Sequence, residues 1–328
     1  MYKFKNYRCK KFGDVSNIHL EEMNSQKLLK NQLRVKILAI GLNYVDVLMI
    51  KGTYQHKAFP PFTPGIEACG IIIEEKCNRK NLLNKKVIIN KKGGCYSEEI
   101  IVNNEDIIVI PSKINSSIAA GFFIPYLTSY VSIIEVGKIK KNQNVLVTGS
   151  SGAVGSASLD ILKKIKANIY PITSTIKKRN YIKKLIGEES ILYDKLKNNN
   201  FLEFKNSMDV VIDINGLLKN ENILSSLKWG GKYIIIGFMN NNITKISTSY
   251  ILIKGLNIYG IRAGEYLKIN KKRKPFIIKK VLAYLINNKA SGLILNNIAF
   301  SELKKGLSKL SNRRSMGKII VKTRHYDG

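Results

Sequence analysis

The sequence predicts an α/β protein in which a β-rich domain is followed by a domain built on a parallel sheet. Three observations support this prediction. The chain has 328 residues, enough for about two domains. Short β-branched runs bounded by Gly and Pro fill its N-terminal third, whereas strand and helix patterns alternate after Pro111. The composition is 45% hydrophobic and 24% charged, which excludes a wholly disordered chain.

Four apolar runs in the N-terminal third have the length and composition of strands. They are residues 33–40, 70–74, 87–90 and 99–102. Residues 41–52 carry apolar side chains at helical spacing, which predicts a short helix after the first strand. Three prolines in residues 60–65 exclude both helix and strand and predict an ordered loop.

Repeated strand and helix units follow Pro111 and imply a parallel sheet. The expected strands are residues 145–147, 168–172, 210–214, 233–236 and 256–259, and the expected helices are residues 155–166 and 177–186. The remaining elements are a helix at 276–287, a strand at 293–300, a helix at 301–310 and a strand at 318–321. Periodicity leaves open whether this tail completes the parallel sheet or returns to the first domain.

The chain is strongly basic, with 55 Lys and Arg against 23 Asp and Glu, a net charge of +32. Proteins that bind nucleic acids usually gather such charge in stripes or patches. Here Lys is spread over nearly the whole chain and is abundant together with Asn and Ile, as a bias toward AT-rich codons would produce. We therefore favour compositional bias over a polyanionic partner, and RNA binding stays a rival interpretation.

Cysteine spacing and hydropathy predict a reduced, cytoplasmic protein. The four cysteines, Cys9, Cys69, Cys77 and Cys95, lie far apart without metal-ligand spacing. The N-terminus runs into polar sequence without the apolar region of a secretory signal. Residues 114–134 are uncharged and long enough to span a bilayer, but their Pro, Ser and Thr content favours a buried helix, so no membrane span is expected.

The most specific local pattern is a glycine-rich turn between an expected strand and an expected helix. Gly149, Gly152 and Gly155 have G-x-x-G-x-x-G spacing, with Ser151 where the usual fingerprint has its second Gly. A strand that leads through such a turn into a helix directs backbone N–H groups and the helix dipole at a pyrophosphate. The dinucleotide contacts predicted here are Gly149, Ser151, Gly152, Ala153, Val154 and Gly155.

The segment after the second strand of the parallel sheet indicates which dinucleotide is bound. Folds that prefer NAD place an Asp or Glu there, on the ribose 2′-OH. Residues 173–179 contain hydroxyls followed by three cations and no carboxylate. Ser174 and Lys178 suit a 2′-phosphate, which predicts NADPH as the cofactor. The alternative is that any helix start in so lysine-rich a chain carries cations.

Several segments together resemble the zinc-independent, zeta-crystallin-like quinone oxidoreductases of the medium-chain dehydrogenase/reductase superfamily. They are residues 41–46, 52–54, 61–67, 149–155, 229–232 and 316–321, in order over nearly the whole chain. The resemblance implies a GroES-like β-barrel catalytic domain at residues 1–121 and 263–328. It also implies a Rossmann NADP-binding domain at residues 122–262, which is built on a doubly wound parallel sheet. The cofactor is then expected in the cleft between the domains, and the protein is expected to form a homodimer.

The resemblance also assigns residues to the active site. Residues 43–45 contain no Cys and Ile66 stands where zinc-dependent relatives carry a His, so no metal is expected. Asn43 and Tyr54 would line the site, with Tyr54 either donating a proton or hydrogen bond to a carbonyl or acting only as a wall residue. The family positions near the cofactor are Thr128, Phe238, Met239 and Arg313, each of which could instead be ordinary packing or surface.

These residues predict an NADPH-dependent oxidoreductase that transfers hydride to a quinone or an α,β-unsaturated carbonyl without zinc. One rival is a reductase of enoyl thioesters carried by coenzyme A or an acyl carrier protein, because Asn43 and Tyr54 also resemble that neighbouring family. Another rival is an RNA-binding protein that keeps the fold without the chemistry. A small-molecule substrate is the partner expected from the first two readings.

Overall fold

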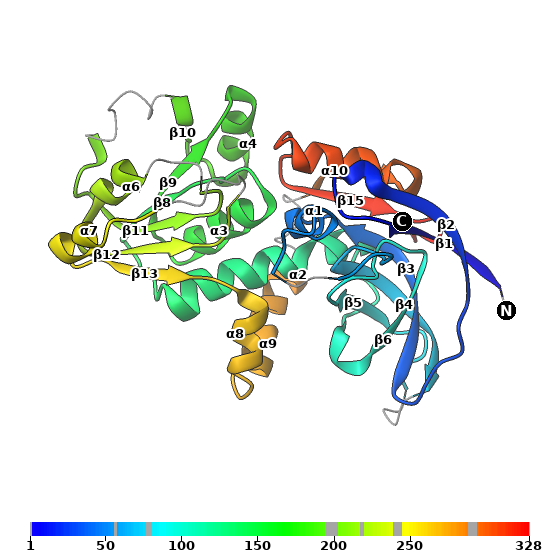
Figure 1. Ribbon diagram of the computed structural model, residues 1–328. Helices are drawn as coiled ribbons and strands as arrows, with labels where there is room; N and C mark the ends of the chain where they lie inside the picture. Colours follow the sequence, from blue (N-terminus) through cyan, green and yellow to red (C-terminus); the bar gives the residue numbers. More distant parts are fainter. Residues whose placement is uncertain are drawn as a thin grey trace. The chain divides into compact units, whose positions relative to one another are not determined.

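A computed structural model describes residues 2–55, 58–76, 81–194, 203–216, 220–238, 245–287 and 294–327 (Figure 1). The chain divides into two compact units, each with its own hydrophobic core. Unit 1 comprises Met1–Ile124 and Tyr284–Gly328, and unit 2 comprises Pro125–Ala283. The expected α/β class is confirmed, with a mainly antiparallel sheet in unit 1 and a parallel sheet in unit 2.

The main sheet of unit 1 contains the four strands expected in the N-terminal third. Its strands are β3 (Gln32–Gly41), β4 (Glu67–Lys76), β5 (Lys86–Asn90), β6 (Glu99–Asn103), β7 (Ile107–Val109), β14 (Ile294–Ala299) and β15 (Lys318–Lys322). β15 pairs antiparallel with β3, so the C-terminal tail returns to the first domain, which periodicity alone had left open. β3 is buried along most of its length because neighbouring strands and helices cover it.

Three strands of unit 1 were not expected from the sequence, and one of them is the three-residue β7 of the main sheet. β1 (Lys3–Cys9) and β2 (Ile18–Asn24) form an antiparallel ribbon of their own. Charged residues such as Lys5 and Glu21 interrupt the apolar alternation by which strands are recognised. The expected short helix is α1 (Tyr44–Ile50), and α10 (Leu303–Ser311) packs against it.

Unit 2 is a six-stranded sheet in which every neighbouring pair is parallel. Its strands are β8 (Asn144–Val147), β9 (Asn168–Thr173), β10 (Ile191–Leu192), β11 (Met208–Asp213), β12 (Leu227–Ile235) and β13 (Asn257–Gly260). Their order is β10-β9-β8-β11-β12-β13, which is the 3-2-1-4-5-6 order of the Rossmann fold. The order reverses between β8 and β11, and ligands of such sheets bind at that switch point.

Helices surround the parallel sheet of unit 2 (Figure 1). They are α3 (Ala153–Lys164), α4 (Ile176–Ile186), α6 (Asn220–Ser226) and α7 (Thr248–Lys254), whereas α8 (Ala263–Ile269) and α9 (Lys274–Ile286) project away from the sheet (Figure 1). α3 follows β8 directly and α4 follows β9, as the alternating pattern predicts. The core beneath them includes Leu146, Val211 and Tyr233.

One long helix carries the chain from unit 1 into unit 2. α2 (Ser116–Tyr130) continues as a π-helix, η3 (Val131–Val136). By length and composition this helix could cross a membrane, and 78% of its most apolar stretch is buried inside the structure. The boundary between the units falls at Pro125, inside α2.

Residues 263–283 lie in unit 2, whereas the sequence analysis assigned them to the first domain. Their attachment has a clear physical basis. Arg273 forms two hydrogen bonds to the carboxylate of Glu135, at 2.9 and 3.0 Å, and the Tyr266 hydroxyl donates to the same carboxylate at 3.2 Å. Glu135 belongs to η3, so α8 and α9 are held to unit 2.

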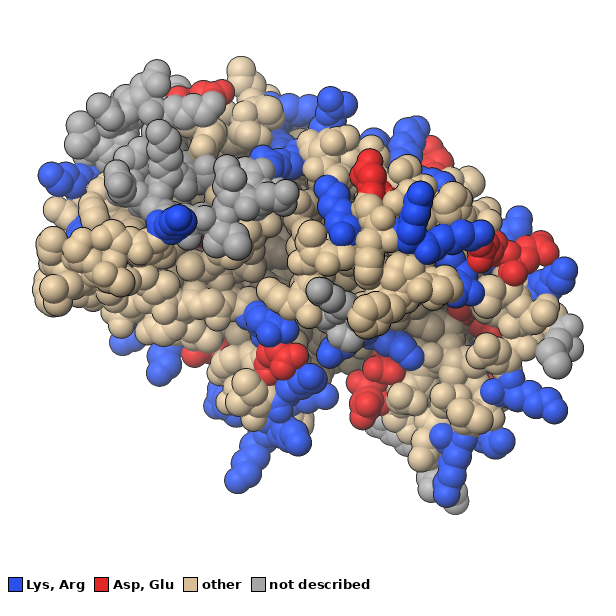
Figure 2. All heavy atoms as spheres, viewed as in Figure 1, with Lys and Arg blue, Asp and Glu red and all other residues tan. Residues whose placement is uncertain are grey.

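The basic residues are dispersed on the face of the molecule that Figure 2 shows. Lys and Arg stand there as many separate groups, with Asp and Glu between several of them. A single continuous basic stripe, the usual mark of a nucleic-acid interface, is not seen on that face.

Candidate functional site

The glycine-rich turn between β8 and α3 lies at the switch point of the parallel sheet. Gly149 has a φ of +60°, and a Cβ there would lie 2.4 Å from the Asn215 side chain. A Cβ at Gly155 would lie 2.3 Å from the Gly149 carbonyl oxygen, so the helix start packs directly on the turn. A Cβ at Gly152, the N-cap of α3, would lie 3.5 Å from the Gly149 carbonyl oxygen, which is an ordinary van der Waals contact. The N–H groups of the first turn of α3 lack helical acceptors and can bind an anion.

Ser150 secures this turn to the sheet. Its hydroxyl donates to the Val147 carbonyl at 2.7 Å and accepts from the Ile172 amide of β9 at 3.1 Å. The neighbouring Ser151 is buried. The four predicted positions from Gly152 to Gly155 cap and begin α3, which places the whole predicted set of contacts in one continuous turn.

A buried polar cluster that was not predicted from the sequence lies next to the glycine-rich turn and stabilises it. Asp213 ends β11, and its carboxylate accepts from the hydroxyls of Thr148 at 2.6 Å and Tyr233 at 2.7 Å. The backbone amides of Asn215 and Gly216 donate to the same carboxylate. Burial and the Asp213 charge raise the pKa of Tyr233, so its hydroxyl stays protonated and donating. The available signal was a pair of polar residues, Asp213 and Asn215, at the end of an apolar strand.

Ser174 and Lys178 meet at the start of α4, next to the carboxyl end of β9. The Lys178 ammonium donates to the Ser174 hydroxyl at 3.2 Å. Thr175 caps the helix by accepting from the Lys178 amide at 3.3 Å. Arg179, the third cation of the segment, is paired instead with Glu189. A hydroxyl and a cation side by side provide donors suited to a phosphate.

The remaining predicted cofactor contacts of unit 2 are on two segments. Thr128 lies on α2 beside Ser129, whose hydroxyl donates to the Val154 carbonyl at 3.0 Å, so this part of α2 adjoins the glycine-rich turn. Phe238 follows β12 and lies against Gly216, because a Cβ at Gly216 would meet its ring at 2.7 Å. Met239 lies outside the described residues.

Unit 1 holds the other three predicted site residues, Asn43, Tyr54 and Arg313. Asn43 precedes α1, and its side-chain amide donates to the Gly41 carbonyl at 3.0 Å and to Glu67 at 3.2 Å. Tyr54 follows the end of α1 and is partly exposed, and its backbone amide donates to the Leu48 carbonyl at 3.2 Å. The structure therefore brings Asn43 and Tyr54 to the two ends of one short helix. Arg313 follows α10 with a φ of +57°.

A buried carboxyl group stabilises the start of α1. Asp46 Oδ2 accepts from the Asn43 amide and from the Tyr96 hydroxyl, each at 2.8 Å, while Oδ1 is buried without a partner. Burial raises the pKa of Asp46 to about 7, although the Tyr96 and Asn43 hydrogen bonds favour its charged form. Burial also raises the pKa of Tyr96 well above its ordinary value. Asp46 therefore changes charge near neutral pH.

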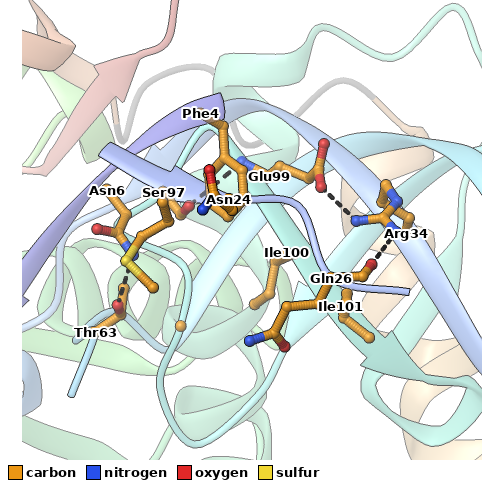
Figure 3. A pocket seen from close by; sticks show the side chains of 12 residues that line it. Phe4, Asn6, Asn24, Gln26, Arg34, Thr63, Ser97, Glu99, Ile100 and Ile101 are labelled. Carbon is orange, nitrogen blue, oxygen red and sulfur yellow. Dashed lines mark hydrogen bonds and ion pairs between the residues drawn. The ribbon is translucent and has the colours of Figure 1, made fainter. Parts of the chain in front are cut away.

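A cavity of about 200 Å³ lies elsewhere in unit 1, between the β1–β2 ribbon and β3 and β6 (Figure 3). Arg34 donates to Glu99 at 2.6 Å and to the Gln26 carbonyl, and Figure 3 shows its guanidinium directed at both. Asn6 donates to Thr63 at 3.2 Å, and its buried oxygen has no partner. The cavity is smaller than the ~300–1,000 Å³ of most ligand pockets, and no residue of the predicted site lines it.

Metal-ligating side chains do not cluster in the described part of the chain. No group of three or more His, Cys, Asp or Glu that could hold a metal ion occurs there. Cys9, Cys69 and Cys95 are free thiols buried in unit 1, and Cys77 lies outside the described residues.

Comparison with known proteins gives matches in both sequence and fold. Residues 29–112 match the Alcohol dehydrogenase GroES-like domain family. The Quinone oxidoreductase-like protein 2 homolog of Nematostella vectensis is 26% identical, over 98% of this chain and 90% of that protein. Among solved structures, Escherichia coli quinone oxidoreductase complexed with NADPH has a TM-score of 0.86 at 19% identity, covering 97% of this chain and 99% of that one. The CurK enoyl reductase has a TM-score of 0.82 at 19% identity, covering 98% and 99%.

Sequence and fold thus agree along nearly the whole chain. The GroES-like match falls within unit 1, and unit 2 has the Rossmann strand order. The comparisons confirm the resemblance drawn from the sequence motifs: the protein is an oxidoreductase that is similar to the quinone oxidoreductases in sequence and in fold.

Proposed function

We propose that the protein is an NADPH-dependent reductase that delivers hydride to a quinone or to the β-carbon of an α,β-unsaturated carbonyl, without zinc. The observation that carries the proposal is the glycine-rich turn at the switch point of the sheet, with the Ser174–Lys178 pair at the next strand end. The relatives named quinone oxidoreductase, one of them solved with NADPH, support it.

The residues present fit a phosphorylated dinucleotide. The first N–H groups of α3, which follow Gly152, provide an anion site for the pyrophosphate. Ser174 and Lys178 offer a hydroxyl and a cation to the 2′-phosphate. When bound, NADPH supplies the hydride. Thr128 and Phe238 lie beside the turn and beside Gly216, where they would limit the space around the rest of the cofactor.

The chain's own contribution to the reduction is positioning and a hydrogen bond to the acceptor. The carbonyl oxygen of a quinone or enone gains charge as its carbon framework is reduced. Tyr54, a neutral phenol at working pH, would donate to that oxygen and then give it a proton. Residues 43–45 contain no Cys and Ile66 stands where zinc-dependent relatives carry a His, so the proposed reduction relies on the Tyr54 hydroxyl rather than on a metal ion.

Removing the Lys178 ammonium is expected to weaken the binding of NADPH but not of NADH. In Lys178→Ala the 2′-phosphate loses a charge-assisted hydrogen bond, which corresponds to an increase of about tenfold in the Kd for NADPH. Calorimetric titration with each cofactor measures the effect. Lys177→Ala removes the same charge one residue away and is the matched control. An equal loss for both cofactors, or in both variants, would contradict the assignment of Lys178.

Replacing the Tyr54 phenol separates the proposed acceptors. In Tyr54→Phe we expect reduction of an α,β-unsaturated ketone to fall about 100-fold, because protonation of its oxygen loses a positioned acid. Reduction of a quinone should change less than about threefold, since the reduced quinone carries a stabilised anion that water can protonate. Steady-state oxidation of NADPH with each acceptor, in the presence of EDTA, provides the measurement.

Tyr44→Phe removes a neighbouring phenol on α1 and serves as the control for that experiment. Crotonyl-coenzyme A is included because the CurK enoyl reductase shares the fold. If the thioester is reduced much faster than any quinone, the protein is an enoyl thioester reductase instead. Activity that EDTA abolishes would refute the zinc-free reaction.

A further inference from the structure

Three side chains from distant parts of the sequence meet inside unit 1. They are Asn43 before α1, Glu67 at the start of β4 and Lys318 at the start of β15. The Lys318 ammonium lies 2.7 Å from both Asn43 Oδ1 and Glu67 Oε2. Lys318 and Glu67 are buried, with side-chain exposures of 1% and 0%. The second oxygen of Glu67 accepts from the Ile124 amide at 2.8 Å, so both of its oxygens have partners.

The charges of this cluster determine how the Asn43 amide is oriented. Its oxygen faces the ammonium of Lys318, and its nitrogen faces two acceptors, the Gly41 carbonyl and the Glu67 carboxylate. A flipped amide would set an NH₂ group against the ammonium and an oxygen against two acceptors. Each of these contacts would be repulsive, so only one orientation is compatible with its neighbours.

The orientation limits what Asn43 can offer a bound molecule. Both amide hydrogens are directed at protein acceptors, and the oxygen uses one lone pair on Lys318. The second lone pair of the oxygen remains the group that can meet a ligand. Asn43 is thus a hydrogen-bond acceptor toward the site.

The same cluster positions the segment that carries Tyr54. Asn43 and Asp46 exchange hydrogen bonds at the start of α1, from the Asn43 amide to the Asp46 carboxylate at 2.8 Å and from the Asp46 amide to the Asn43 carbonyl at 3.1 Å. At the other end of α1 the amide of Tyr54 binds the Leu48 carbonyl. Fixing Asn43 therefore fixes the start of the helix whose end holds Tyr54.

We propose that Lys318 and Glu67 are positioning residues that make Asn43 accept a hydrogen bond from an O–H or N–H group of the bound cofactor or substrate. Resting on the proposed reductase function, this assignment leaves the carbonyl oxygen of the substrate to Tyr54, because Asn43 has no donor to give it. Lys318 also balances the charge of Glu67, which would otherwise be an unpaired anion inside unit 1.

Hydrogen exchange of the Asn43 side-chain amide tests the orientation without any measurement of activity. Its NMR signals are assigned by their absence in Asn43→Asp. In the wild-type protein we expect them to exchange at least about tenfold more slowly than those of the exposed Asn31, because both hydrogens are bonded. In Lys318→Met the protection should disappear. Equal exchange in both proteins would overturn the proposal.

A double-mutant cycle tests the positioning role. Lys318→Met and Asn43→Ala should each lower kcat for NADPH-dependent quinone reduction about tenfold, and the double variant should lose no more than either single one. A double variant impaired about 100-fold would mean that Lys318 acts independently of Asn43, and the proposal would fail. Lys318→Arg keeps a buried cation, so this variant should retain the protection of the Asn43 amide and a kcat within about threefold of the wild type. If Lys318→Met does not fold, Lys318→Arg takes its place in the experiment.

The two experiments separate this proposal from the function on which it rests. A wild-type protein that reduces no acceptor but shows a protected Asn43 amide contradicts the reductase, while the orientation stands. An active enzyme whose Asn43 amide exchanges freely contradicts the positioning role alone.

Discussion

Gly155→Ala is expected to abolish detectable NADPH binding and to lower the stability of unit 2. The new methyl group would lie 2.3 Å from the Gly149 carbonyl oxygen and 2.6 Å from the backbone of Ser150. These are backbone atoms that cannot move aside without opening the turn. Overpacking of this kind costs about 3 kcal/mol. Because the displaced turn is the proposed pyrophosphate site, we expect the Kd for NADPH to rise by at least about 100-fold.

Gly152→Ala separates the loss of NADPH binding from the loss of stability. A methyl group there would meet only the Gly149 carbonyl oxygen, at 3.5 Å, so stability should stay within about 0.5 kcal/mol of the wild type. The methyl group would be added at the N-cap of α3, where the pyrophosphate is proposed to bind, so NADPH binding should still be weakened. Thermal unfolding followed by circular dichroism gives the stabilities, and calorimetry gives the affinities.

Gly264→Ala is the control for both glycine variants. A Cβ at Gly264 meets nothing within 4 Å, and the residue belongs to α8 of the same unit. This variant should keep both wild-type stability and wild-type affinity. Unchanged NADPH affinity in Gly155→Ala would remove the glycine-rich turn from the cofactor site.

Asp46→Asn is expected to stabilise the protein at alkaline pH and to leave it unchanged near pH 4. Burial raises the pKa of Asp46 from about 4 in the unfolded chain to about 7 in the folded protein. Between these values the folded state holds a proton that the unfolded state releases. The stability contribution of Asp46 is therefore lost as pH rises from about 4 to 7, in total on the order of 4 kcal/mol.

The amide in Asp46→Asn keeps one oxygen for the Asn43 amide and the Tyr96 hydroxyl, so the geometry is retained while the charge is removed. Urea unfolding between pH 4 and pH 8 should show the stability difference between variant and wild type growing over that interval and levelling off above it. Asp14→Asn alters an exposed carboxylate and should show no such trend. A constant difference at every pH would mean that Asp46 is not protonated in the folded protein at neutral pH.

Sequence patterns predicted the elements of the fold that are determined by neighbouring residues along the chain. Most of the Rossmann unit was predictable because five of its strands and the helices α3 and α4 show their own periodicity, and Gly149 to Gly155 can form a turn of only a few kinds. The two-residue β10 and the helices α6 and α7 were not expected. The end of unit 2 was not predictable, because α8 and α9 are held by the Arg273–Glu135 pair between segments distant in sequence. Nothing in the local pattern of either segment signals that pair.

In the candidate site, too, some residues could be predicted from the sequence and others could not. Asn43 and Tyr54 were identified by resemblance to a family, and the phosphate turn by its spacing. Lys318 could not be found in this way, since a Lys in a chain of 55 basic residues has the same appearance whether it is exposed or buried against Glu67. Its role follows from a contact with Asn43 across 275 positions of sequence.

Because β15 pairs with β3, the two units can complete their folding at different times during synthesis on the ribosome. Unit 2 is encoded without interruption by residues 125–283, so all of its strands are available once that stretch has emerged. Unit 1 lacks β14 and β15 until residues 294–322 are synthesised, and the Ala39–Gly41 end of β3 lacks its β15 partner until then. A nascent chain stalled before Tyr284 should therefore protect unit 2 against protease while the N-terminal sheet is still cut.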